Sequence, residues 1–66
     1  MIIDYDDIFK AKLAESALKV ARIDCAFTPN TLKGACLVHR VEFADADRDA
    51  AIEALEHRGL YNSTQH

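Results

Sequence analysis

The sequence predicts a small single α+β domain over residues 1–60: a long N-terminal helix, a short β-hairpin and a C-terminal helix. Three observations predict it. Two segments combine apolar residues at helical spacing with acidic starts and basic ends. Between them, residues 35–43 alternate apolar and polar side chains, as a half-buried strand does. The chain has 66 residues, which is room for one domain.

The first helix is expected from Asp4 to about Asp24. Asp4 is a suitable cap, Asp6 and Asp7 fall in the first turn, and basic residues lie near the end. A helix of this length spans about 30 Å at the standard rise per residue. Its apolar side is expected to carry Tyr5, Phe9, Leu13, Ala17 and Val20, widened by Ile8, Leu18 and Ala21.

The hairpin is expected to pair residues 35–43 with the alternating Ile23, Cys25 and Phe27, across a loop from Thr28 to Gly34. The alternative is an all-α, three-helix domain, in which Thr28 caps a middle helix that begins at Pro29. Gly34 and the β-branched residues of 35–43 favour the strand.

The last helix is expected over residues 45–60. Asp45, Asp47 and Asp49 suit the positive end of a helix, and Gly59 followed by Leu60 is typical of a left-handed helix stop. Residues 61–66 are expected to form a flexible polar tail, which contains the glycosylation-like triplet at 62–64.

The same acidic run also matches part of an EF-hand calcium loop, with Glu56 at its twelfth position. The sixth position, where the loop needs glycine, holds Ala50, so we favour the helix. Zinc is the second metal to consider, with Cys25, Cys36 and His39 as ligands and His57 or His66 as the fourth. Cys36 and His39 would point to opposite faces of a strand, so we expect no metal and no cofactor.

Composition narrows the function classes. The net charge is −3, the pI is about 5.4, and the basic residues are spread along the chain, which argues against nucleic-acid binding. The sequence has no apolar run of the length that a membrane span needs and no secretion signal, so we expect a cytoplasmic protein with reduced cysteines. The core is expected to be alanine-rich, held by Phe9, Phe27 and Phe43, and a homo-oligomer, such as a homodimer, would compensate for its small size.

No nucleophile, base or phosphate-loop motif is recognisable, so we expect no enzymatic activity. We expect a protein-binding module that acts as a regulator, inhibitor or adaptor. Its expected partner-binding residues are an apolar group and two acidic clusters: Tyr5, Ile8 and Phe9, with Asp4, Asp6, Asp7, Asp45, Asp47 and Asp49.

Two other classes stay open. One is a structural subunit of a larger assembly such as a virion, since helix–hairpin–helix order also occurs in small phage head-completion proteins. Element order alone carries no function, however. The other is a calcium- or zinc-binding module, whose melting temperature would shift with metal.

Overall fold

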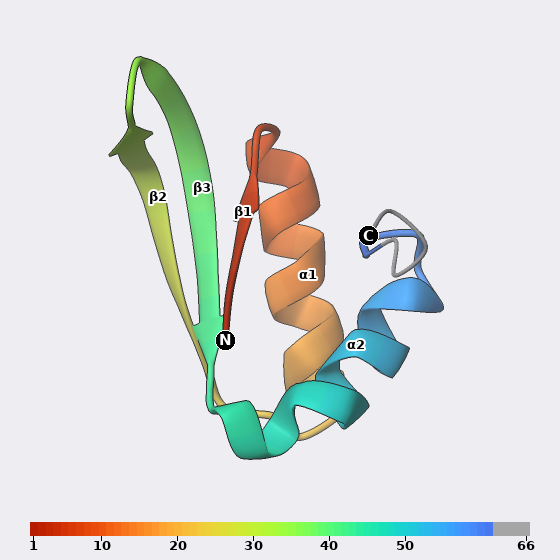
Figure 1. The fold of residues 1–66 in the computed structure, drawn as a ribbon. Helices are drawn as coiled ribbons and strands as arrows, with labels where there is room; N and C mark the ends of the chain where they lie inside the picture. The colour runs from red at the N-terminus through yellow and green to blue at the C-terminus, as the bar shows by residue number, and fades with distance from the viewer. Residues whose placement is uncertain (62–66) are drawn as a thin grey trace.

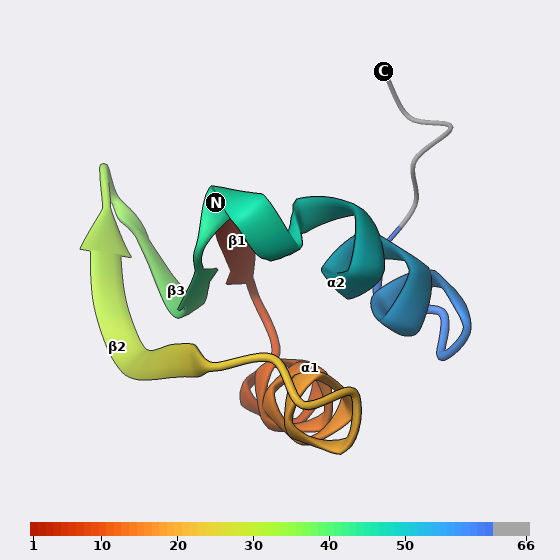
Figure 2. The ribbon, with the colours of Figure 1, turned by 90° about the horizontal axis from the view of Figure 1, so that it is seen from below.

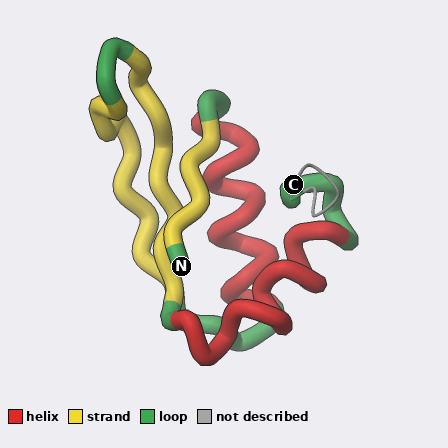
Figure 3. The backbone as a smooth tube through the Cα atoms, viewed as in Figure 1, coloured by secondary structure: helices red, strands yellow, loops and turns green. Residues whose placement is uncertain are grey.

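The computed structural model describes residues 1–61. In chain order the elements are β1 (Ile2–Tyr5), α1 (Ile8–Val20), β2 (Cys25–Lys33), β3 (Cys36–Phe43), a 3₁₀ turn η1 (Asp45–Asp47) and α2 (Arg48–Glu56). The sheet is antiparallel with β3 in the centre, and both helices lie on one side of it (Figure 1 and Figure 3). The predicted α+β class is confirmed. The all-α alternative is wrong, because β3 pairs with a strand on each side.

The N-terminal helix is shorter than predicted, because residues 2–5 form a strand. Ile3 and Tyr5 stand opposite Val41 and His39 of β3, on the face that the helices cover. α1 therefore begins at Ile8, and its cap is Asp7, not Asp4: the Asp7 carboxylate accepts a 2.8 Å hydrogen bond from the Phe9 N–H. With 13 residues, α1 spans about 20 Å.

α1 buries Ala17 and Leu18 as predicted, but not the large side chains that were predicted on the same apolar side. Its buried residues are small ones and a single leucine: Ala11, Ala14, Ala17 and Leu18. Phe9, Leu13 and Val20 are 73%, 57% and 73% exposed, so Phe9 is not part of the core. Alanines let the helix backbone come close to its neighbours, and α1 contacts all three strands and α2 (Figure 2).

The hairpin is longer than predicted, because the break at Thr28–Gly34 is a bulge and not a loop. Pairing stops after Thr28 and resumes at Thr31. Pro29, which has no N–H, is tolerated because β2 is an edge strand. Asn30 adopts a left-handed conformation (φ +56°), and its N–H donates to His39 Nδ1 at 3.1 Å. The strands then turn at Gly34 (φ +62°) and Ala35.

Both helices end in the same hydrogen-bonded stop. At the end of α2 the Leu60 N–H donates to the Leu55 carbonyl at 2.9 Å and the Gly59 N–H donates to the Glu56 carbonyl at 3.0 Å. This is a Schellman motif with Gly59 left-handed (φ +68°), as its sequence predicted. α1 ends in the same way, but Arg22 (φ +62°) takes the left-handed position.

Residues 62–66, most of the expected tail, lie outside the described residues, and the triplet at 62–64 lies there too. Leu60 and Tyr61 pack against the core. The core itself joins Tyr5, Leu18, Val41 and Leu55 with the buried alanines, and its small side chains match the predicted composition. Over the described residues, the helices are too short or too polar to cross a membrane.

Candidate interaction surface

The main apolar surface on the outside of the molecule is a line of three residues along α1. We call Phe9, Leu13 and Val20 the α1 stripe. They recur at intervals of four and seven residues, which places them on one side of a helix. Their exposed fractions are 57% or more. A surface helix normally turns such side chains inward, so α1 is apolar on two opposite faces.

Lysines border the α1 stripe. Lys10 lies on one flank, and Lys12 and Lys19 lie on the other, as the helical spacing requires. α1 contains these three lysines and one acidic residue, Glu15, which gives the helix a charge of 3 − 1 = +2 in a chain of net charge −3. α1 is therefore locally basic in an acidic chain.

A shallow hollow adjoins the Val20 end of the α1 stripe, between α1 and α2. It is lined by small apolar groups and two basic side chains: Ala17, Val20, Ala21, Ala54, His57 and Arg58. The hollow continues both the apolar character and the basic border of the stripe. The α1 stripe is therefore flanked by a depression at its Val20 end.

A second exposed apolar pair lies near the tip of the hairpin. Leu32 and Leu37 are cross-strand partners and are 75% and 50% exposed. By strand alternation they point to the same side of the sheet as Val41, which is buried. The hairpin extends past the start of α1, so no helix covers its tip (Figure 1).

The opposite face of the sheet carries a polar cluster around Asp4. Arg40 Nε donates to Asp4 Oδ1 at 2.9 Å, and Lys33 Nζ lies 3.3 Å from Asp4 Oδ2. The Arg40 hydrogen bond lowers the pKa of Asp4, and burial partly opposes it. This expected partner-binding residue is thus engaged within its own sheet.

The expected partner-binding residues are dispersed over the molecule. Tyr5 is 8% exposed, and its hydroxyl donates to the Leu60 carbonyl at 2.9 Å, so its ring is unavailable to a partner. Ile8 is half-buried, and Phe9 is the exposed member of that group. Of the acidic cluster, Asp6 is exposed and Asp7 caps α1.

The two acidic clusters do not form one patch. Tyr5 pairs with His39 and Ile2 pairs with Glu42, so Asp6 and Asp7 follow one end of β1 while residues 45–49 follow the opposite end of the sheet (Figure 1). Asp45 is instead engaged by the Met1 ammonium group at 2.7 Å, whose hydrogen bond lowers the pKa of this carboxyl. Asp47 and Asp49 lie at the start of α2, as the helix interpretation requires.

In the part of the chain that is described, the residues considered as calcium or zinc ligands do not come together. Cys25 stands opposite Phe43, and Cys36 stands opposite Lys33, at the two ends of the hairpin ladder. Cys36 and His39 fall on opposite faces of β3. Residues 45–56 form a turn and a helix, not a calcium loop. Within residues 1–61, no group of three or more His, Cys, Asp or Glu side chains is placed to hold a metal ion.

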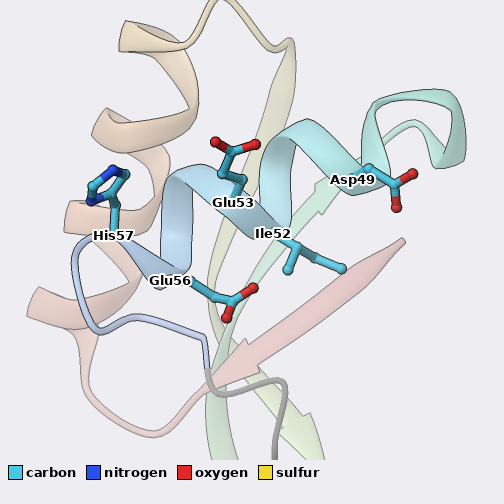
Figure 4. Close-up of a pocket in the computed structure, with 5 residues that line it drawn as sticks. All are labelled: Asp49, Ile52, Glu53, Glu56 and His57. Atoms are coloured by element: carbon cyan, nitrogen blue, oxygen red, sulfur yellow. The ribbon is translucent and has the colours of Figure 1, made fainter.

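A further hollow on α2 is lined by Asp49, Ile52, Glu53, Glu56 and His57 (Figure 4). Glu53 and Glu56, a carboxylate pair in sequence, point to different sides of the helix, and His57 lies beyond them. A general acid–base pair must converge on one reacting atom. The side chains of this hollow diverge.

The α1 stripe and its lysine border combine Phe9, which the sequence singled out, with residues that it did not. Leu13 and Val20 were assigned to the core face. The missed signal was the set of alanines at helical spacing, Ala11, Ala14 and Ala17, which mark the side of α1 that is buried. No protein-family model, curated protein or solved structure matches this chain.

Proposed function

We propose that this protein is a non-enzymatic protein-binding module that acts as a regulator, inhibitor or adaptor, and that its binding surface is the α1 stripe. The observation that carries the proposal is the orientation of α1. Alanines face the core, while Phe9, Leu13 and Val20, which gain most from burial, face outward. Burial of these three side chains by a partner would stabilise a complex through the same apolar contact that holds a core. A cytoplasmic location is part of this proposal.

The test is capture of a partner from a lysate of the native source, with three baits compared. The wild-type chain should enrich a partner that Leu13→Asp loses, because a carboxylate in the centre of an apolar contact is costly to desolvate. Leu32→Asp is the control, since Leu32 is also exposed (75%, against 57% for Leu13) but lies on the hairpin. A circular dichroism spectrum must show that all three are folded. Equal capture by all three baits would contradict the proposal.

A structural subunit of a larger assembly is the second candidate, and the hairpin tip supports it. A subunit with two separate apolar surfaces can contact two neighbours at once, and Leu32 and Leu37 provide the second surface. This candidate predicts that Leu32→Asp abolishes concentration-dependent assembly of the wild-type chain in sedimentation velocity. A chain that never assembles would exclude it.

A further inference from the structure

We propose that the α1 stripe binds an acidic amphipathic helix of a partner protein. The partner's apolar side chains would lie on Phe9, Leu13 and Val20, and its flanking Asp and Glu side chains would pair with the bordering lysines. This inference rests on the proposed function and adds the chemical class of the partner.

The spacing on α1 fits a helix as the partner. At about 100° per residue, Phe9, Leu13 and Val20 fall within about 40° of one another around the helix. Lys10 lies about 80° to one side of their centre, and Lys12 and Lys19 lie about 80–100° to the other. These are the relative positions of seam residues and flanking charged residues in paired helices. The stripe is narrow and straight, as a helix partner requires, and the exposed Ser16 interrupts it between Leu13 and Val20.

The lysines that border the α1 stripe favour a partner helix with acidic side chains. α1 (Ile8–Val20) carries Lys10, Lys12 and Lys19 against Glu15, a net charge of 3 − 1 = +2, and the remaining residues therefore sum to −3 − 2 = −5. The Glu15 carboxylate lies 3.7 Å from Lys19 Nζ, but the Lys19 side chain is still 65% exposed and available to a partner. Flanking carboxylates would meet cations on both sides of the apolar contact, which favours this class over neutral or basic helices.

The same border disfavours a second copy of this chain on the α1 stripe. In an antiparallel symmetric pair of α1 helices, the flank that carries Lys12 and Lys19 faces the same flank of the other copy, so lysines meet lysines. In a parallel pair, each lysine flank again meets a lysine flank. Like charges along a helix seam oppose pairing. An anionic membrane is also less favoured, because α1 is held against the sheet by its other face and offers only three apolar side chains to the lipid.

The test uses two synthetic peptides with leucine at the seam positions of three heptads. One carries glutamate at the flanking positions and the other carries lysine, so each peptide repels itself and stays free to bind. Titration into ¹⁵N-labelled protein, followed by NMR, should shift the amide signals of residues 9–20. The glutamate peptide should bind at least about tenfold more tightly than the lysine peptide.

Variants then separate the two parts of the recognition. Leu13→Asp should weaken binding of the glutamate peptide at least about tenfold. The double variant Lys12→Glu and Lys19→Glu should reverse the preference, so that the lysine peptide binds better. Two controls should leave both affinities unchanged: Leu32→Asp makes the apolar-to-acidic change on the hairpin, and Arg48→Glu reverses one basic charge at the start of α2.

Three results would overturn the inference: equal affinity for both peptides, binding to phosphatidylserine vesicles but to neither peptide, or self-association that Leu13→Asp abolishes. The proposed function is tested separately, by the capture experiment. If the wild-type chain captures a partner from the lysate that Leu13→Asp does not, the protein-binding function is supported and only the acidic class of the partner is wrong. If no bait differs from another, the proposed function fails as well.

Discussion

At the scale of single residues, the Tyr5 side chain ties β1 to the segment after α2. Its hydroxyl donates to the Leu60 carbonyl at 2.9 Å, and burial raises the pKa of Tyr5 to about 12 from 10.0. A raised pKa means that the folded protein holds this proton more tightly than the unfolded chain. The stability from Tyr5 is therefore complete below pH 10 and is lost as the pH rises through 12.

Tyr5→Phe should lower the free energy of unfolding by about 1 kcal/mol at pH 7, because the Leu60 carbonyl loses its partner. The variant should also lose less stability than the wild type between neutral pH and pH 11. Urea unfolding followed by circular dichroism at several pH values measures both effects. Parallel pH curves for the two proteins would show that Tyr5 is not the titrating group.

The pKa of Asp4 is shifted in the opposite direction to that of Tyr5, so its contribution to stability is lost at low pH. Its pKa lies below 3.8, chiefly because of the Arg40 hydrogen bond, so the folded protein binds this proton less tightly than the unfolded chain. The stability it contributes is present above pH 3.8 and is lost as the pH falls through the lower folded value. Asp4→Asn should cost about 1 kcal/mol at pH 7, since Arg40 is partly exposed and water screens the pair. The difference from wild type should shrink toward pH 2 in urea unfolding; a constant difference would contradict it.

At the scale of elements, two adjacent positions test which face of α1 is buried. Ala14 is fully buried and Leu13 is 57% exposed. Ala14→Leu should cost about 1–3 kcal/mol through overpacking. Leu13→Glu should change the free energy of unfolding by no more than about 0.5 kcal/mol, because the site is a surface one and both residues favour helix. Urea unfolding of the two variants compares them directly, and the reverse order would mean that the large side chains face the core.

The left-handed residues that end the two helices, Arg22 and Gly59, can be compared directly by substitution. Gly59→Ala should destabilise the protein by about 1 kcal/mol: nothing lies within 4 Å of the added methyl group, so the cost is that of the left-handed backbone alone. Arg22→Gly should stabilise it by about 0.5–1 kcal/mol, since it removes that same cost at the end of α1. Thermal unfolding should shift in opposite directions for the two variants. A shift in the same direction would contradict the shared motif.

How far each element could be predicted depended on where its signals lie. The last helix was predictable, because its acidic start and its Gly59–Leu60 stop are local. β1 was not, because Asp4, Asp6 and Asp7 resemble a helix start and only pairing with β3, distant in sequence, makes residues 2–5 a strand. Thr28–Gly34 was misassigned because Pro29 interrupts a central strand but not an edge strand. The α1 stripe was missed because two apolar faces compete on one helix, and packing against the sheet chooses between them.

At the scale of the whole molecule, charge separation predicts how salt acts on association. The net charge of −3 suggests that two copies repel weakly and that acidic partners are repelled too. The charge of +2 on α1 changes that expectation locally, because screening confines each interaction to about 10 Å at 0.1 M salt. Added salt should therefore weaken the binding of α1 to an acidic helix. It should strengthen the binding of α1 to a second α1.

The homodimer predicted from the small core can be tested through this difference. Sedimentation equilibrium between about 50 mM and about 500 mM NaCl measures self-association, and self-association through α1 should strengthen as salt screens the facing lysines. Binding of the glutamate peptide should weaken over the same range. A dimer that forms through the hairpin tip should survive Leu13→Asp and be lost in Leu32→Asp. Self-association that weakens with salt and is lost in Leu13→Asp would mean that the lysine border faces carboxylates of another copy, and this result would overturn the inference of a separate partner protein.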